Sequence, residues 1–370
     1  MSIRFHSLAI DEIFDETSDA YSVFFQKPDL EEFHYKPGQY LTLKVPYQGE
    51  LLRRAFSLSS SPCSDDRLSV TIKRVEGGRI SNHIRDVLKA GDQVELLPPM
   101  GNFYVETDPT HAIHYILIGA GSGITPLMSI LKTVMEEEPL SKVSLWYGNR
   151  TEDTIIFFDQ LQALQAQYKG RLEVYHTLSR PSEGWEGGKG RLDQTRIYQM
   201  VSDLFMTDEY RKKYYICGPD GLMQAAQTAL EKHAVNPGDV HREYYSAPLP
   251  KAEELEAQAQ EAEVADGKVF RDGDKVYTVE AQDITITLNG EETQVPVSPD
   301  HYILDAALDA KLDPPFACQA GICTTCRAYL HAGEVAMDES EGLSETEINE
   351  GFILTCRSHP LTPGVEIEFK

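Results

Sequence analysis

Four cysteines in the last part of the chain have a spacing that suits an iron–sulfur cluster. They are Cys318, Cys323, Cys326 and Cys356, in the pattern C-x4-C-x2-C…C. Four thiolates can hold two tetrahedral irons bridged by two sulfides, and this spacing is the plant-type [2Fe–2S] pattern. The alternatives are a zinc site or buried free thiols, but zinc sites usually combine C-x2-C with a second close pair. The sequence contains no such second pair, so the spacing favours the cluster.

A glycine-rich turn in the middle of the chain has the form of a nucleotide-binding loop. It follows an apolar stretch at residues 114–118 and precedes a helical pattern at residues 126–138. The glycines permit a tight turn, the helix N-terminus favours a pyrophosphate, and a proline suits the first helical position. A plain strand-to-helix turn is the alternative, because a glycine-rich turn alone is weak evidence. The residues that we assign to a nicotinamide cofactor here are Gly119, Gly121, Gly123, Thr125 and Pro126.

A second loop, formed by Cys217, Gly218 and Pro219, follows another predicted strand at residues 213–217. Parallel sheets present ligand-binding loops at the ends of such strands, so this loop is a second candidate for cofactor binding. On its own, however, a single cysteine at a strand end is more often inert packing.

Two short motifs in the first hundred residues could hold a flavin. In the first, Arg54 can pair with a pyrophosphate, Phe56 can lie against the ring, and Ser57 can hydrogen-bond a ring nitrogen. In the second, Gly78 and Ser81 begin a predicted short helix and offer backbone donors and a hydroxyl to phosphate. Each motif alone is weak, since a strand arginine usually faces solvent and paired glycines often form only a turn.

The pattern of secondary structure predicts three domains around these motifs. Short β-rich runs alternate with turns over residues 38–105, which is typical of an antiparallel barrel. From residue 112 strands alternate with helices, which indicates a parallel, doubly wound α/β sheet. The expected parts are a flavin-binding barrel at 1–108, a nicotinamide-binding α/β domain at 109–248, an acidic linker at 249–268 and a small ferredoxin domain at 269–370.

Composition and charge exclude some classes of function. The net charge of −25 argues against nucleic acid as a partner, because a polyanion is bound through basic residues. No apolar run approaches the ~20 residues of a membrane-spanning helix. The N-terminus lacks a secretory pattern, so we expect no membrane insertion and a cytoplasmic location. Residues 269–370 carry nineteen acidic and six basic residues, which form either a partner-docking face or a solvated surface.

Taken together, the motifs and their order resemble the ferredoxin–NADP(+) reductase superfamily with a plant-type ferredoxin fused at the C-terminus. The superfamily motifs Arg-x-Tyr/Phe-Ser/Thr, Gly-x-x-Ser/Thr and Cys-Gly-Pro all have counterparts in the residues named above. The resemblance covers all but the linker and extends to the reductase subunits of phenylacetyl-CoA epoxidases and ketosteroid hydroxylases. It implies FAD as the flavin and a β-grasp α+β fold for the ferredoxin domain.

The resemblance also implies roles for individual residues. Ser57 is expected near the reactive N5 edge of the flavin, Cys217 beside the nicotinamide, and Glu243 close to the flavin, and these three have the predicted catalytic roles. Plant enzymes of this type end in a tyrosine that covers the flavin, whereas this chain continues. Either Tyr244 or Tyr245 could take that place, or either could belong to the core. Further expected cofactor contacts are Lys73, Ile80, Asp220 and Met223.

The residues after the predicted strand 172–177 bear on the choice of nicotinamide cofactor. A 2′-phosphate requires a cation and a hydroxyl, whereas a plain ribose is usually held by Asp or Glu. Ser179 and Arg180 occupy this position, and Arg191 could reach the same phosphate. We therefore expect NADPH to be preferred over NADH, the alternative being that Arg180 only lies on the surface.

The function implied by the resemblance is transfer of a hydride from the nicotinamide to FAD, followed by single electrons to the cluster. The expected partner is an external, iron-containing oxygenase that collects these electrons. Alternative acceptors are a fatty-acyl desaturase, a ketosteroid hydroxylase or a nitrogen-oxide enzyme. An alternative of another class is a zinc-stabilised binding module without redox activity.

Overall fold

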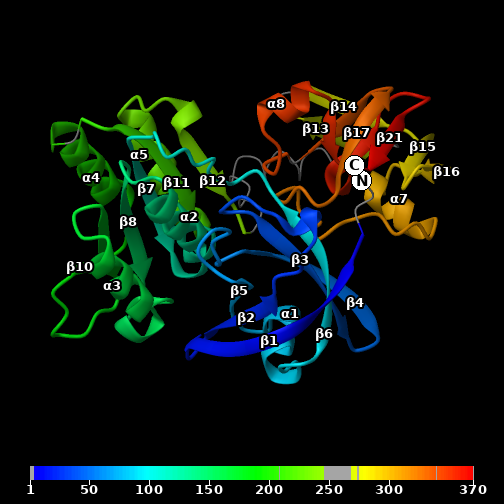
Figure 1. The fold of residues 1–370 in the computed structure, drawn as a ribbon. Coiled ribbons are helices and arrows are strands. Elements are labelled where there is room, and N and C mark those ends of the chain that lie inside the picture. The colour runs from blue at the N-terminus through cyan, green and yellow to red at the C-terminus, as the bar shows by residue number, and fades with distance from the viewer. Residues whose placement is uncertain (1–3, 208, 246–267, 273–274, 339, 370) are drawn as a thin grey trace.

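Three successive parts make up the molecule, coloured blue to cyan, cyan to yellow-green and yellow to red in Figure 1. The expected combination of antiparallel barrel, parallel α/β sheet and β-grasp ferredoxin is confirmed. No helix in the described part of the chain is long and apolar enough to cross a membrane. The expected linker, 249–268, lies outside the described residues except for its last position. The computed structural model describes residues 4–207, 209–245, 268–272, 275–338 and 340–369.

The first part is a closed antiparallel barrel. Its elements are β1 (His6–Thr17), β2 (Ala20–Gln26), η1 (Glu31–Phe33), β3 (Tyr40–Tyr47), β4 (Glu50–Ser57), β5 (Arg67–Lys73), α1 (Arg79–Val87) and β6 (Gln93–Met100). The strands pair in the order β4-β3-β6-β1-β2-β5, and a bridge between Leu58 and Val70 brings the two outer strands together. Alternate side chains such as Leu41 and Leu43 are buried in the barrel, as the strand period of two requires.

The second part is a doubly wound parallel sheet. Its elements are β7 (Ile113–Ala120), η2 (Gly121–Gly123), α2 (Ile124–Glu137), β8 (Lys142–Asn149), η3 (Glu152–Thr154), α3 (Phe158–Gln167), β9 (Leu172–Leu178), β10 (Gly188–Lys189), α4 (Gln194–Thr207), β11 (Arg211–Cys217), α5 (Asp220–Lys232), η4 (Pro237–Asp239) and β12 (Val240–Glu243). The strand order is β10-β9-β8-β7-β11-β12, and one core lies on each face of the sheet. Cys217 is the register partner of Gly119, so the two predicted cofactor loops lie side by side at the carboxyl ends of the strands.

The third part has the β-grasp arrangement. Its elements are β13 (Lys268–Asp272), β14 (Lys275–Val279), β15 (Gln282–Leu288), β16 (Glu291–Val297), α7 (Ile303–Asp309), β17 (Arg327–Ala332), β18 (Val335–Met337), α8 (Glu345–Asn349), β19 (Phe352–Leu354), η5 (Thr355–Arg357), β20 (Ser358–Pro360) and β21 (Glu366–Phe369). The main sheet has the order β16-β15-β21-β17-β19 and includes one parallel pair, β15 with β21. Helix α7 packs on one face of this sheet. The cysteine loop lies in the chain between α7 and β17.

Candidate flavin, nicotinamide and cluster sites

The three residues with predicted catalytic roles meet where the barrel contacts the α/β sheet. Ser57, Cys217 and Glu243 are the last residues of β4, β11 and β12. The Ser57 Oγ donates to Glu243 Oε2 at 2.8 Å, and Cys217 Sγ lies 3.9 Å from the same oxygen. Because β11 and β12 are adjacent parallel strands, Cys217 and Glu243 are also register partners. The structure therefore brings these three side chains into one group.

Burial controls the charge of this group. It raises the pKa of Glu243 to about 8, although the hydrogen bond from Ser57 opposes the shift. It also raises the pKa of the Cys217 thiol well above its usual value, and the neighbouring Glu243 adds to that shift. Both groups are therefore mostly uncharged at neutral pH, because the low-dielectric surroundings disfavour their ionised forms.

Tyr245 covers these residues. Its hydroxyl lies 2.8 Å from Thr125 Oγ1 and 3.3 Å from Ser57 Oγ, so it links α2 to the barrel. Tyr244, by contrast, packs against the core cluster beneath α5, and its hydroxyl is 3.5 Å from Arg242 Nη1. Of the two tyrosines that the sequence left open, Tyr245 is therefore the one that stands beside the predicted catalytic residues.

The glycine turn and the Cys-Gly-Pro loop fit together because no side chain separates them. A Cβ atom on Gly123 would lie 2.0 Å from the carbonyl oxygen of Cys217, and Gly121 has a φ of 55° in the left-handed region. Helix α2 begins at Ile124, so Pro126 is its third residue and not its first, as the sequence suggested. The proline is still tolerated, since the N–H groups of the first turn have no partner within the helix.

The predicted flavin-binding residues lie on β4 and at the start of α1. Arg54 is exposed, while its neighbour Arg53 is buried. Gly78 is the N-cap of α1 and supplies no side-chain cap, so the first-turn N–H groups can receive a phosphate. The Ser81 Oγ accepts from the backbone N–H of Val75 at 3.3 Å, which holds this turn in place. An exposed arginine and an uncapped helix N-terminus are both groups that suit the diphosphate of FAD.

The structure does not gather every predicted contact in this way. Lys73 forms an ion pair with Asp19, with Nζ 3.1 Å from Oδ2, and Ile80 packs against the barrel core. Met223 is only 1% exposed within the core cluster beside α5, and it presents almost no surface to a ligand. Asp220 is the first residue of α5, directly after the Cys-Gly-Pro loop.

Exposed cations lie at the ends of β8, β9 and β10. The Arg180 N–H donates to the Arg150 carbonyl at 2.7 Å and the Ser179 N–H to the Asn149 carbonyl at 3.0 Å, so the ends of β8 and β9 are adjacent. Arg191 follows β10, which pairs with β9. The side chains of Arg150, Ser179, Arg180 and Arg191 are all exposed or partly exposed. Arg150 was missed in the sequence, because only the strand order places it beside Arg180.

The four cysteine thiols converge in the ferredoxin part. Cys318 shares hydrogen bonds with Cys323 and Cys356, and these bonds lower the pKa of Cys318 well below its usual value although burial opposes them. Cys326 shares another with Cys356. The backbone N–H of Ala320 also donates to Cys318 Sγ at 3.4 Å. In the described residues, no group of three or more His, Cys, Asp or Glu side chains is arranged to bind a single metal ion. A two-iron cluster needs only two thiolates on each iron. These four thiols therefore fit the cluster.

Arg53 connects the barrel to the cysteine loop. Its Nη1 donates to the Pro314 carbonyl at 2.9 Å, its guanidinium pairs with Asp313, and its Cζ lies 4.2 Å from the ring centroid of Phe316. Since strand side chains alternate, Arg53 and Arg54 point to opposite faces of β4. One strand thus contributes to both the ferredoxin contact and the predicted flavin site.

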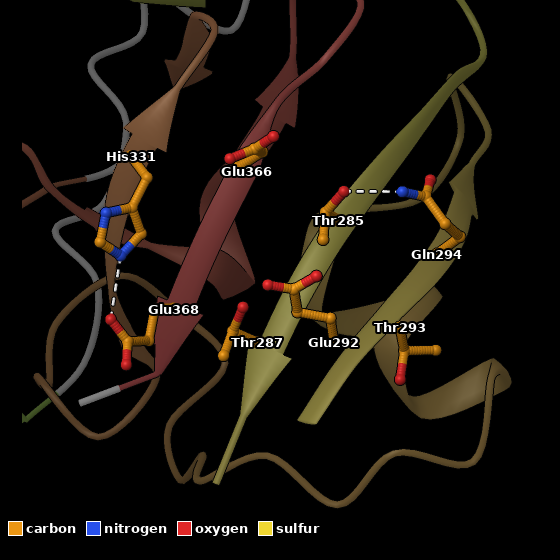
Figure 2. Close-up of a pocket in the computed structure, with 8 residues that line it drawn as sticks. All are labelled: Thr285, Thr287, Glu292, Thr293, Gln294, His331, Glu366 and Glu368. Carbon is orange, nitrogen blue, oxygen red and sulfur yellow. Dashed lines mark hydrogen bonds and ion pairs between the residues drawn. The ribbon is translucent and has the colours of Figure 1, made fainter. Parts of the chain in front are cut away.

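The outer face of the ferredoxin sheet is acidic (Figure 2). Thr285 alternates along β15 with buried residues and therefore points away from the core. Glu366 is its register partner on β21, and Glu292 on β16 is the partner of Thr287. His331 Nε2 is 2.9 Å from Glu368 Oε2. Part of the strong negative charge of this part of the chain is thus displayed on the outer sheet face, on Glu292, Glu366 and Glu368.

Comparison with protein families assigns a cofactor to each part. Residues 8–104 match the oxidoreductase FAD-binding domain family, and residues 117–228 match the oxidoreductase NAD-binding domain family. Residues 286–361 match the 2Fe-2S iron-sulfur cluster binding domain family. The expectation of FAD and a [2Fe–2S] cluster is confirmed by these matches.

Similar proteins match the chain over nearly its whole length. It is 33% identical over 368 residues to one of the subunits of 1,2-phenylacetyl-CoA epoxidase from Escherichia coli (strain K12), covering 99% of this chain and 98% of that protein. It is 35% identical over 371 residues to the ferredoxin reductase component of 3-ketosteroid-9-alpha-monooxygenase from Mycobacterium tuberculosis (strain ATCC 25618 / H37Rv), covering 98% and 95%. The solved structure of phthalate dioxygenase reductase shares the fold, with a TM-score of 0.59, 23% identity and 98% of each chain covered.

Fold, site and matches together define an oxidoreductase that passes electrons from a nicotinamide cofactor through FAD to a [2Fe–2S] cluster. The chain belongs to the ferredoxin–NADP(+) reductase superfamily, in the group that carries a plant-type ferredoxin at its C-terminus.

Proposed function

We propose that this chain is the reductase component of an oxygenase system and delivers electrons to a separate, iron-containing oxygenase. The supporting observation is that the likeness to an epoxidase subunit and to the ferredoxin reductase component of a monooxygenase spans at least 98% of the chain, so all three modules occur in the same order. Those two relatives are named for different substrates. The chemistry common to them is electron delivery, and the acceptor sets the substrate.

Separate residues bind the two parts of the flavin. Arg54, the N-cap residue Gly78 and Ser81 in the first turn of α1 bind the diphosphate. Phe56 lies against the ring, and Ser57 hydrogen-bonds the ring edge. When bound, FAD accepts a hydride and returns electrons one at a time, which suits a [2Fe–2S] cluster that carries one.

The group around Glu243 prepares the place where the hydride arrives. Cys217 is fully buried and Thr125 nearly so, and Tyr245 bonds to the hydroxyls of Thr125 and Ser57. Tyr245 therefore has to swing away before a nicotinamide can reach Cys217. Glu243 keeps its proton below about pH 8, so no carboxylate repels the incoming electron pair.

The remaining assignments concern the nicotinamide and the cluster. The glycine turn and α2 bind the cofactor diphosphate. The 2′-phosphate of NADPH is bound by Arg180, Ser179 and Arg191, and NADPH is therefore preferred over NADH. The cluster ligands are Cys318, Cys323, Cys326 and Cys356. Cysteines that serve as metal ligands must stay reduced, which is typical of a reducing compartment and supports a cytoplasmic location. The proposed domain limits are 1–108, 109–248 and 269–370, and each range encloses one of the three largest sheets of the described residues.

The function is tested by reconstitution with purified candidate oxygenase components. We expect NADPH consumption to be coupled to substrate oxygenation with only one of them, in a ratio near one product per NADPH. The matched control is the Cys323→Ser variant, which should still reduce ferricyanide through the flavin but should support no product. If product forms equally well with that variant, or if no oxygenase accepts electrons, the proposed role is wrong.

A further inference from the structure

Tyr40 is a barrel residue whose hydroxyl lies inside the cluster-binding loop. It is the first residue of β3, it is 5% exposed, and it packs with Ala317 and Cys323 of that loop. Its hydroxyl oxygen is 3.0 Å from Thr324 Oγ1 and 3.1 Å from Thr325 Oγ1. It also accepts the backbone N–H of Thr324 at 3.0 Å. The loop that holds the cluster is thus tied to a side chain of another module.

The protons available on these groups limit which of them can donate and which can accept. The Thr324 N–H can only donate, so the Tyr40 oxygen is an acceptor there, and the single phenol proton remains for a threonine hydroxyl. Thr325 Oγ1 lies 3.4 Å from Cys323 Sγ. A ligand thiolate has no proton, so Thr325 has to donate to the sulfur and can accept from Tyr40. These contacts allow an order of donation that runs from Tyr40 through Thr325 to Cys323. The competing partners are Thr324 Oγ1, 3.0 Å from the Tyr40 oxygen, and Thr42 Oγ1, 3.3 Å from Thr325 Oγ1.

We propose that Tyr40 is a positioning residue that sets the reduction potential of the cluster by orienting and polarising the hydroxyl of Thr325 toward Cys323. Hydrogen bonds to ligand sulfurs stabilise the reduced, more negative cluster and raise its potential. Consecutive hydrogen bonds strengthen one another, so the phenol increases the effect of the threonine. Because Tyr40 belongs to the barrel, this contribution exists only while the ferredoxin module is docked on it.

The reduction potential of the cluster therefore differs between the docked and the released ferredoxin module. While docked, the higher potential favours acceptance of an electron from the flavin. Once the module leaves the barrel to meet an acceptor, the bond from Tyr40 is lost, and the cluster becomes a stronger reductant. A tyrosine that only filled space would give no such difference.

The test is a redox titration of the full-length, flavin- and cluster-loaded protein, followed by the electron paramagnetic resonance signal of the reduced cluster. Tyr40→Phe removes one oxygen and should move the cluster potential to a more negative value. The matched control is Tyr35→Phe, since Tyr35 is a buried barrel tyrosine whose hydroxyl bonds to Ser60 Oγ at 2.8 Å, away from the cysteine loop. Its cluster potential should not change. An unchanged or more positive potential in Tyr40→Phe would overturn the proposal.

Variants of Thr325 keep the test decisive if Tyr40→Phe does not assemble a cluster. Thr325→Val removes the final donor and should lower the equilibrium constant for cluster reduction roughly tenfold, a shift of about 59 mV. Thr325→Ser keeps the hydroxyl and should restore the original potential. The double variant Tyr40→Phe/Thr325→Val should shift no further than Thr325→Val alone. Additive shifts, or a Thr325→Val protein with the original potential, would show that no such chain of donors operates. The assignment of Cys323 as a ligand is checked separately by iron analysis of Cys323→Ser.

Discussion

The flavin barrel meets its two neighbours through contacts of different chemistry. Toward the α/β sheet, Ser57 bonds to Glu243, a half-buried residue whose pKa is raised to about 8 by desolvation. Toward the ferredoxin, Tyr40 bonds to the neutral hydroxyls of Thr324 and Thr325. Ser57 and Tyr40 are themselves paired across β3 and β4, so the two interfaces start from the same point of the barrel.

The difference follows from what crosses each interface. A hydride carries a nucleus and two electrons, so the first interface needs an open path and control of local charge. In the proposed function Tyr245 blocks that path until cofactor binds, and Glu243 holds a proton there. A single electron crosses without moving atoms, so the second interface needs only a fixed, close contact. Buried hydroxyls and the Arg53 contacts with Asp313 and Pro314 supply it.

The largest predicted effect is the loss of the cluster, which should leave flavin reduction at the other interface intact. Cys323→Ser should abolish the cluster, because a two-iron centre needs four thiolates, while FAD content and flavin reduction by NADPH remain. Iron analysis and stopped-flow flavin absorbance measure the two outcomes in one preparation. Two irons per chain in the variant would remove Cys323 from the ligand set.

The second prediction concerns the hydride side alone. Charge-assisted hydrogen bonds contribute ~1.5–3 kcal/mol each, so Arg180→Ala should lower kcat/KM for NADPH roughly tenfold or more. The value for NADH should hardly change, and it is the internal control, since NADH lacks only the 2′-phosphate. Arg150→Ala should act in the same direction, because the ends of β8 and β9 are adjacent. Equal losses with both cofactors would mean that Arg180 supports the fold or the shared adenosine.

The third prediction is that the two electron-transfer steps, flavin reduction and flavin-to-cluster transfer, depend differently on pH. As pH rises through about 8 Glu243 loses its proton, and the new carboxylate repels the arriving electron pair. The rate of flavin reduction by NADPH should therefore fall roughly tenfold for each unit above that pKa, following the protonated fraction. Flavin-to-cluster transfer should not follow this titration, because Glu243 lies at the other interface and the ferredoxin contact is made by the Tyr40 hydroxyl and by Arg53.

Glu243→Gln is the matched variant for that profile. The amide keeps the shape of the protonated acid and cannot ionise, so the rate of flavin reduction should become independent of pH between 7 and 9, at roughly the low-pH value. A profile that still falls through pH 8 in this variant would assign the titration to another group.

Sequence reasoning found the first interface far better than the second. Ser57 and Cys217 belong to short motifs that carry a local signal, and the role of Glu243 is implied by the resemblance to the superfamily. The contacts of Arg53 and Tyr40 pair residues more than two hundred positions apart, and neither residue stands out in its strand. Which tyrosine covers the site was also open, because the alternation of β12 and the packing of α5 decide it.

The fourth prediction weakens the second interface without touching the cluster. Arg53→Gln removes the bond to Pro314, the ion pair with Asp313 and the stacking on Phe316. Flavin-to-cluster transfer should slow several-fold, while the pH profile of flavin reduction stays as in the parent. Asp313→Asn should do less, because Asp313 is 67% exposed and exposed ion pairs contribute about 0–1 kcal/mol. A larger effect from Asp313→Asn would contradict this ranking.

The smallest expected effect concerns the acidic helix α8, which carries Glu345 and Glu347 in the part of the chain whose charge forms either a partner-docking face or a solvated surface. The structure separates these two residues. Glu347 bonds to Arg327, Asn102 and Ser344, and these hydrogen bonds lower its pKa although burial opposes them. It therefore joins α8 to the barrel, and its replacement tests docking within the chain.

Glu345 is exposed and is the proper probe of steering by α8. If α8 guides the acceptor, Glu345→Gln should slow electron delivery up to about twofold at low salt and reduce its dependence on ionic strength, since removing one exposed charge changes encounter rates only modestly. Glu366→Gln is the matched control, because it removes the same charge from the outer sheet face shown in Figure 2. A salt effect in the Glu366 variant alone would place the acceptor on that sheet. Loss of rate in both would mean that the summed charge of the module, and no single face, attracts the acceptor.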